Sequence, residues 1–168
     1  MENAAERRLF WGAALSVVAL DLITKLVAEA TLLLTPGVPV IGDWFQLRLV
    51  YNRGAAFGLH VGQYSRWVFF AVAVIAIVVL DRMSRATPLG DRFRQLALGF
   101  VAGGAAGNLI DRIRSARGVV DFLDVGIGAL RWPTFNVADI AVSCGGIALA
   151  IALWREDQRR TQAESAAA

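Results

Sequence analysis

Four long apolar segments constrain the fold of this chain more than any other feature of its sequence. They cover approximately residues 9–27, 64–83, 93–110 and 135–154. Each is close to the roughly 20 residues that an α-helix needs to cross a bilayer. Because 57% of the residues are hydrophobic, the composition is that of a membrane protein rather than an ordinary soluble domain. We therefore expect one all-α membrane domain, residues 1–168, with four transmembrane helices.

The first apolar segment also has features of a removable signal peptide. Arg7 and Arg8 precede it, and residues 28–30 read Ala-Glu-Ala, which resembles a cleavage site. Asp21 and Lys25 argue against removal, because the apolar core of a signal peptide rarely carries a charge pair. On a helix these two residues lie on one face and can form an ion pair. The sequence therefore predicts that this segment is retained as the first transmembrane helix.

A short stretch between the first two apolar segments has the pattern of a β-strand. In residues 44–51, hydrophobic side chains at every second position alternate with a set that includes Gln46 and Arg48. This is the period of a half-buried strand. The run N-R-G-A-A-F-G follows at residues 52–58, and its glycines allow a tight backbone close to a ligand. We expect a small extramembrane β-like segment at approximately residues 38–58, with an ordinary linker as the alternative.

The basic residues indicate which side of the membrane each chain end faces. The short connection between the second and third apolar segments contains Arg82, Arg85 and Arg92, and short basic loops tend to stay in the cytoplasm. An even number of transmembrane helices places both termini on that same side. The polar C-terminal tail, residues 155–168, is expected to fray. Because the basic residues sit mostly at helix ends, where they anchor the chain, nucleic acid is not an expected partner.

Asp121 and Asp139 are the candidate catalytic pair. Asp121 follows the third apolar segment and Asp139 begins the fourth, so antiparallel neighbouring helices would bring both to one face of the membrane. The helix dipole favours a carboxylate at Asp139, and the apolar neighbours of Asp121 would raise the pKa of its carboxyl group. Two carboxyl groups that share one proton can provide the base and the acid for amide hydrolysis. The alternative is two interfacial aspartates that Arg112 and backbone amides satisfy.

Other polar groups gather at the same predicted membrane face. Asn108 and the pair Asp111 and Arg112 lie at the end of the third apolar segment. An interfacial helix cap with an ion pair is the alternative reading of Asp111. Gly103 and Gly107 lie four positions apart in this segment, a spacing that lets two helices pack backbone against backbone.

Other classes of function are weaker matches to the sequence. The chain has one cysteine, Cys144, and one histidine, so no zinc site is expected. Cys144 is expected to pack within the fourth helix. Intramembrane carboxylates also act as proton relays, so a small transporter or proton-coupled channel is the main alternative. A non-catalytic membrane scaffold is a third, although it gives no reason for polar residues to gather at one face.

Five short motifs, in order along the chain, resemble those of the bacterial lipoprotein signal peptidases, or type II signal peptidases, which are membrane aspartyl proteases. The motifs are Asp21-x-x-Thr24-Lys25, Asn52-Arg53-Gly54-Ala55-Ala56-Phe57-Gly58, Gly103-Gly104-x-x-Gly107-Asn108-x-Ile110-Asp111-Arg112, Val120-Asp121-Phe122 and Phe135-Asn136-x-Ala138-Asp139. Each motif alone is weak, but five in this order in a chain with four apolar segments are specific. Only the two tails fall outside the resemblance.

The resemblance implies four transmembrane helices in the bacterial inner membrane, both termini in the cytoplasm and a small periplasmic β-cradle. It implies an aspartic endopeptidase that removes the signal peptide from diacylglyceryl-modified prolipoproteins, cleaving just before the lipidated cysteine. The active site would face the periplasm and would activate water with two aspartates, with no metal ion or organic cofactor. The implied partners are the prolipoprotein, membrane lipid and cyclic peptide inhibitors of the globomycin type.

The resemblance also assigns roles to individual residues. Asp121 and Asp139 would be the catalytic pair. The residues that would bind or orient the substrate are Asn52, Gly54, Asn108, Arg112 and Asn136. The residues that would support the site structurally are Asp21, Lys25 and Asp111.

Overall fold

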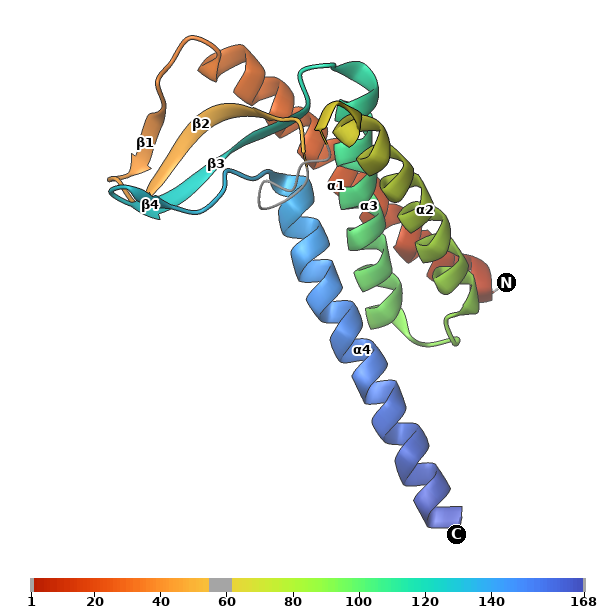
Figure 1. The fold of residues 1–168 in the computed structure, drawn as a ribbon. Helices are drawn as coiled ribbons and strands as arrows, with labels where there is room; N and C mark the ends of the chain where they lie inside the picture. Colours follow the sequence, from red (N-terminus) through yellow and green to blue (C-terminus); the bar gives the residue numbers. More distant parts are fainter. Residues whose placement is uncertain (1, 55–61, 168) are drawn as a thin grey trace.

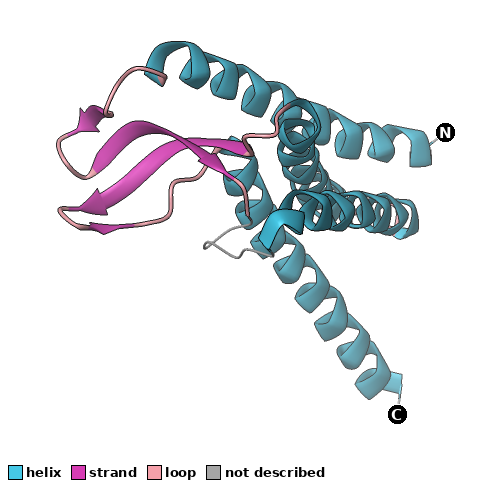
Figure 2. Ribbon diagram, turned by 45° about the horizontal axis from the view of Figure 1, so that its top comes forward, coloured by secondary structure: helices cyan, strands magenta, loops and turns pink. Residues whose placement is uncertain are grey.

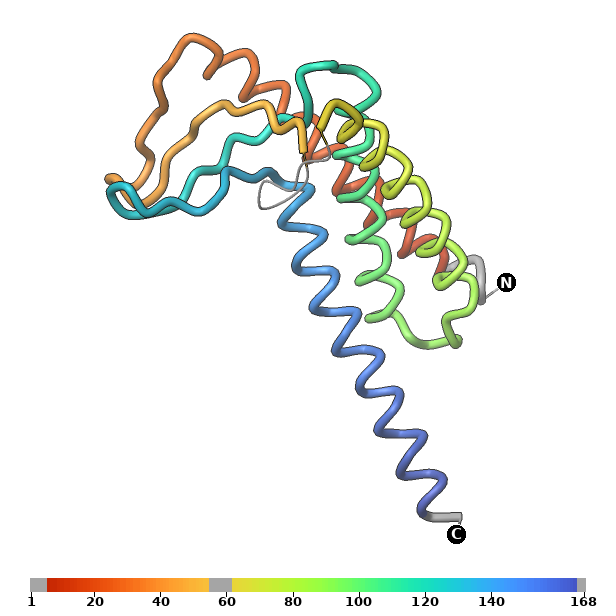
Figure 3. The backbone as a smooth tube through the Cα atoms, in the orientation of Figure 1, coloured from red at the N-terminus to blue at the C-terminus, as the bar shows by residue number. Residues whose placement is uncertain are grey.

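The computed structural model describes residues 2–54 and 62–167, and it contains four long helices and a small sheet. In chain order the elements are α1 (Glu2–Leu32), β1 (Val38–Ile41), β2 (Phe45–Asn52), the short 3₁₀ helix η2 (Gly62–Tyr64), α2 (Ser65–Ala86), α3 (Arg92–Arg114), β3 (Val119–Ile127), β4 (Leu130–Arg131) and α4 (Val137–Ala167). The sheet extends from one end of the helical bundle (Figure 1). The backbone trace shows both chain ends far from the sheet (Figure 3). The prediction of a mostly helical chain with a small β element is confirmed.

α3 lies at the centre of the bundle and contacts α1, α2 and α4 (Figure 1). The strands, magenta in Figure 2, lie to one side of these helices. A Cβ atom on Gly103 would lie 2.6 Å from the carbonyl oxygen of Ala14 on α1, and one on Gly104 would lie 2.4 Å from that of Ala138 on α4. No side chain fits at these distances, so the helix backbones pack directly against each other. The packing role predicted for Gly103 is therefore confirmed.

Within the described residues, three helices are long and apolar enough to cross a membrane. The candidate spans cover residues 6–32, 62–86 and 137–165. The third expected segment, residues 93–110, is not among them: α3 is a full helix, but its composition is more polar than that of the other three. That α3 also crosses the membrane therefore stays a prediction. Because three helices surround α3, its buried positions include polar side chains such as Gln95 and Asp111. Contact with other helices, rather than with lipid, explains this composition.

The sheet is antiparallel, with the strand order β1-β2-β3-β4. β2 confirms the strand expected within residues 44–51, whereas the end of the expected β-like segment, residues 55–58, lies outside the described part of the chain. The alternation of polar and apolar residues does not reveal β3. Its first four residues, Val119, Val120, Asp121 and Phe122, are all buried, so both faces of this half of the strand are covered. Strands buried on both faces lose the period-2 pattern.

A small apolar cluster attaches the sheet to the bundle. Ala28 and Leu32 at the end of α1 pack together with Phe122 of β3. Successive side chains on a strand point to opposite faces. With Phe122 turned towards α1, the preceding residue, Asp121, is directed to the other face of the sheet.

The C-terminal tail is helical, and the expectation that residues 155–168 fray is wrong for the described part. α4 continues without a break to Ala167. The tail is rich in arginine, glutamate, glutamine and alanine, which favour the helix. Along residues 155–165 the side chains are exposed, apart from the half-buried Glu156. Helix propensity, rather than burial, therefore accounts for this extension of α4 beyond the bundle.

Candidate active site

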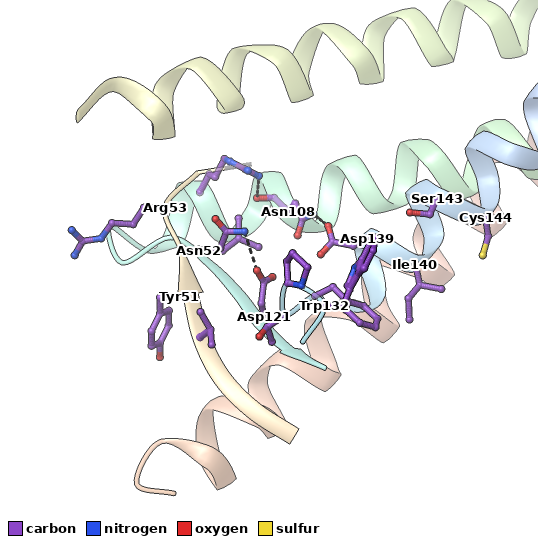
Figure 4. Close-up of a pocket in the computed structure, with 16 residues that line it drawn as sticks. Tyr51, Asn52, Arg53, Asn108, Asp121, Trp132, Asp139, Ile140, Ser143 and Cys144 are labelled. Carbon is purple, nitrogen blue, oxygen red and sulfur yellow. Dashed lines mark hydrogen bonds between the residues drawn. The ribbon is translucent and has the colours of Figure 1, made fainter. Parts of the chain in front are cut away.

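A cavity of about 680 Å³ opens where the sheet meets α3 and the beginning of α4 (Figure 4). Its lining residues are Val50, Tyr51, Asn52, Arg53, Asn108, Arg112, Val119, Asp121, Trp132, Pro133, Thr134, Phe135, Asp139, Ile140, Ser143 and Cys144. Asp121 and Asp139, singled out from the sequence, both lie in this lining. Their catalytic role remains a prediction, but the fold brings the two carboxyl groups to the same cavity.

Asp121 is held by two amide side chains. Asn52 Nδ2 donates to its Oδ2 atom at 3.0 Å, and Asn136 Nδ2 donates to its Oδ1 atom at 2.7 Å. The residue is only 2% exposed. Burial, and then the nearby charge of Asp139, raise the pKa of the Asp121 carboxyl group to about 7, while the two amide hydrogen bonds lower it. Asp121 can therefore carry a proton near neutral pH.

Asp139 lies in the first turn of α4, where Asn136 precedes the helix. The backbone amide of Asn136 donates to Asp139 Oδ2 at 3.1 Å, and the amide of Asp139 donates to Asn136 Oδ1 at 2.9 Å. This reciprocal pair is the geometry of a capping box. Because Asn136 also donates to Asp121, one residue connects both carboxyl groups.

Asn108 completes the contacts of Asp139. Its Nδ2 atom donates to Asp139 Oδ1 at 2.9 Å (Figure 4). Its Oδ1 atom accepts from Lys25 Nζ at 2.9 Å and from Asn136 Nδ2 at 3.1 Å. With two donors on its oxygen, the amide of Asn108 has one favourable orientation, and its nitrogen faces Asp139.

Arg112 borders the cavity without an ion pair to either aspartate. Its guanidinium group donates to the carbonyl oxygen of Asn108 at 3.0 Å and to that of Gly54 at 3.2 Å. The amide of Gly54 in turn donates to Asn52 Oδ1 at 2.9 Å. The alternative reading has Arg112 and backbone amides satisfy the two aspartates. Among the described residues, the amide of Asn136 does bond to Asp139, but neither aspartate forms an ion pair with Arg112.

A buried ion-pair cluster lies directly behind the site. Lys25 is 0% exposed, and its Nζ atom lies 2.7 Å from Asp21 Oδ2 and 2.8 Å from Asp111 Oδ2. The ion pair expected between Asp21 and Lys25 is confirmed. Asp111 Oδ2 also accepts from the amide of Val120 at 3.1 Å, and Asp21 Oδ1 accepts from the amide of Ala138 at 2.9 Å. Each carboxylate thus holds the residue immediately before one of the two cavity aspartates.

Glycine makes room for this cluster. A Cβ atom on Gly107 would lie 2.5 Å from Asp21 Oδ2. The sequence spacing predicts backbone packing at Gly107, as at Gly103. In the structure, the absence of a side chain at Gly107 instead leaves space for the carboxylate of Asp21, and no neighbouring backbone fills this space.

Several lining residues were not predicted from the sequence. Trp132, Pro133 and Thr134 come from the connection that leads into α4. On α4 itself, Ile140, Ser143 and Cys144 share a face with Asp139 at helical spacing. The expectation that Cys144 packs within its helix is wrong, because the side chain is exposed and borders the cavity. Helical spacing from Asp139 is the sequence signal that would have found this wall.

No group of three or more His, Cys, Asp or Glu side chains that could hold a metal ion occurs among the described residues. The chemistry that the cavity offers comes from its two carboxyl groups, from the amides that orient them and from Arg112. The environments of the two carboxyl groups differ. Asp121 is buried on β3, whereas Asp139 lies at the N-terminal, positive end of the α4 dipole.

Comparison with protein families gives one match over most of the chain. The family model described as "Signal peptidase (SPase) II" matches residues 13–155. A protein named lipoprotein signal peptidase from Syntrophomonas wolfei subsp. wolfei is 42% identical over 153 residues, covering 89% of this chain and 95% of its own. One of the same name from Oleidesulfovibrio alaskensis is 41% identical over 142 residues, covering 83% and 90% of the two chains.

A solved structure described as a bacterial membrane enzyme has the same fold. It superposes with a TM-score of 0.78 and 31% sequence identity, and the match covers 88% of each chain. The similarity therefore extends through the bundle and the sheet rather than being limited to the apolar helices.

Proposed function

Because this chain belongs to the signal peptidase II family, we propose that it is an aspartic endopeptidase that removes the signal peptide from diacylglyceryl-modified prolipoproteins. Membership makes it a peptidase with membrane-spanning character. The cleavage site just before the lipidated cysteine, and the use of Asp121 and Asp139, are parts of the proposal. The observation that carries it is that both carboxyl groups line one cavity in unlike environments.

In the proposed reaction, the two aspartates divide the proton transfers. Asp139 is ionised and takes a proton from the water that attacks the scissile carbonyl group. Asp121 is protonated and gives its proton to the carbonyl oxygen, so that a tetrahedral gem-diol forms. When the gem-diol collapses and the C–N bond breaks, the proton that Asp139 took from water passes to the leaving nitrogen. Asp121 takes back a proton from a hydroxyl group of the gem-diol, so both carboxyl groups return to their starting states. The raised pKa of Asp121 supports this assignment, because a proton donor must hold its proton near neutral pH.

The remaining polar residues orient the substrate. Asn52 and Asn108 each hold one aspartate, which fixes the carboxyl groups against rotation. Arg112 lines the cavity and has donors beyond those bound to Asn108 and Gly54, so it is placed to bind a peptide carbonyl group. In the proposal, Gly54 and Asn136 position these groups, and Asp21, Lys25 and Asp111 support them from behind.

The membrane arrangement is part of the same proposal. α3 crosses the bilayer inside a ring of α1, α2 and α4, so that residues 1–168 form one domain with four transmembrane helices. The sheet lies at the periplasmic face of the bacterial inner membrane, and both termini lie in the cytoplasm. The ion pair between Arg7 and Asp81, at 2.8 Å, supports this arrangement because it joins the beginning of α1 to the end of α2.

The cavity has a side suited to the lipid. Trp132, Pro133, Phe135 and Ile140 contribute an apolar wall next to the carboxyl groups. A diacylglyceryl group bound along this wall would hold the adjacent peptide bond at the aspartates, and such positioning can supply several kcal/mol of the barrier reduction. A cyclic peptide of the globomycin type would compete for the same space.

Purified protein in detergent is expected to cut a diacylglyceryl-modified prolipoprotein at least about 100-fold faster than the unmodified form, because the lipid provides the positioning energy. The measurement is a gel-shift cleavage assay with both forms of one substrate. Equal rates on the two forms would contradict the role of the lipid. If folded protein cuts neither form, the peptidase proposal fails, and proton flux in liposomes then tests the channel alternative.

The rate of cleavage is expected to fall as the pH rises above 7. Below the raised pKa of about 7, Asp121 carries the proton that it donates, and above this pKa the proton is lost. The value of kcat/KM should approach a tenfold decrease per pH unit on this alkaline limb. Initial rates between about pH 5 and pH 9 test this. A rate that rises through pH 7 would mean that Asp121 acts in its ionised form and that the two roles are reversed.

A further inference from the structure

A second cavity, of about 690 Å³, lies at the end of the bundle opposite the aspartates. It is formed by the connection before α3, the beginning of α3 and the C-terminal part of α4, which continues past α3 (Figure 1). Its lining includes Arg92 and Phe93 at the beginning of α3, and Arg155, Glu156, Arg159 and Arg160 on α4. The residues from α4 recur every three or four positions, so one face of this helix forms the wall.

The charge of this cavity is positive. Four arginines line it, against two acidic residues, Asp91 and Glu156. Both acids already have partners: Asp91 Oδ1 accepts from the amide of Arg94 at 3.0 Å, and Glu156 Oε2 accepts from the Arg94 side chain at 2.7 Å.

The lining arginines have no such partners. Among residues 2–54 and 62–167, no ion pair engages Arg92, Arg155, Arg159 or Arg160, although Arg155 lies over the Phe93 ring at 5.7 Å. Three of them, on consecutive turns of α4, remain available for an anion.

The cavity lies where the apolar part of the helices ends. Trp154 is 63% exposed and immediately precedes Arg155, and Trp11 on α1 is 45% exposed. Exposed tryptophans of membrane helices gather at the level of the lipid headgroups. From the cavity, an exposed apolar row of Phe93, Leu96 and Phe100 runs along one face of α3 towards the middle of the helix. The positively charged second cavity is therefore continuous with an exposed apolar face of α3, against which acyl chains can pack.

We propose that this second cavity binds the phosphate-bearing headgroup of an anionic phospholipid. Arginine matches the geometry and charge of a phosphate, and basic pockets between membrane helices bind such headgroups. The apolar row favours a lipid over a soluble phosphate, because it offers the acyl chains a surface continuous with the headgroup site. The site is independent of the peptidase proposal, since it lies at the other end of the bundle.

Native mass spectrometry of the detergent-purified full chain tests this, with phosphatidylglycerol and phosphatidylcholine titrated in parallel. Wild-type protein is expected to bind phosphatidylglycerol at least about tenfold more tightly than phosphatidylcholine. The triple variant Arg155→Gln, Arg159→Gln, Arg160→Gln should lose most of this preference. Cleavage of a prolipoprotein by the same variant should be unchanged, because none of these residues borders the aspartates.

The matched control removes the same charge from the same end of the bundle. Arg8→Gln, Arg82→Gln, Arg85→Gln changes three arginines that lie outside the cavity, and it should keep the lipid preference within about twofold of wild type. The proposal is wrong if wild type shows no preference or if the control loses it equally. If glycerol 3-phosphate displaces the lipid at comparable concentration, the site takes a soluble phosphate, and the assignment to a lipid is overturned.

Discussion

Replacement of Asp121 or Asp139 by asparagine is expected to lower kcat/KM for the lipidated substrate by at least about 10³-fold. Each change removes one carboxyl group but keeps the shape of the side chain. Asp139→Asn removes the proposed base, and Asp121→Asn removes the proposed proton donor. Because the two groups act as one unit, the double variant should be little slower than either single variant.

Asp124→Asn is the matched control for these variants. Asp124 lies on the same strand as Asp121 and is equally buried, at 2% exposed. Its Oδ1 atom accepts from Arg131 Nε at 2.8 Å, and it does not line the cavity. Cleavage by this variant should remain within a few fold of wild type. If Asp121→Asn is no slower than Asp124→Asn while both remain folded, Asp121 has no catalytic role.

Replacement of Lys25 by methionine is expected to destabilise the folded chain by about 3–5 kcal/mol. The ammonium group of Lys25 lies between the carboxylates of Asp21 and Asp111, and all three side chains are buried. Methionine has a similar length but no charge, so two carboxylates would remain close together in an apolar interior. The free energy of unfolding in detergent, measured by denaturant titration, gives this loss directly.

Arg114→Met provides the comparison for Lys25→Met. Arg114 also pairs with Asp111, at 2.8 Å, but the Arg114 side chain is 28% exposed, and Asp111 keeps its ion pair with Lys25 when Arg114 is replaced. The expected loss is about 1 kcal/mol or less. Equal losses for the two variants would contradict the view that the buried lysine supports the site.

The four helices, β2 and the side of the bundle on which the candidate aspartates lie could be predicted because they depend on local pattern. Apolar segments of membrane length indicated the helices, and the spacing of Asp21 and Lys25 indicated their ion pair, which the structure contains. The alternation within residues 44–51 indicated β2. Each of these features is set by residues that are near one another in the sequence.

The features that were missed depend on contacts between distant segments. β3 is buried on both faces, so it lacks the alternation that marks a strand with one exposed face. The composition of α3 becomes understandable only when three helices are seen around it. Asn136 forms hydrogen bonds with Asp121 and Asn108, which lie 15 and 28 positions earlier in the sequence. Local sequence pattern gives no information on contacts between residues so far apart in the chain. The site is therefore the least predictable part of the chain in its details.

The hydrogen bond from the Ala138 amide to Asp21 joins residues that are 117 positions apart. During synthesis, α1 is made long before α4, so this part of the site can form only after the beginning of α4 has been translated. Until then, Lys25 provides Asp21 with a counter-charge from one turn further along the same helix. The charges of Asp21 and Lys25 can therefore compensate each other within α1 before α4 exists, and the geometry around Asp139 is completed only when α4 packs against α1 and α3.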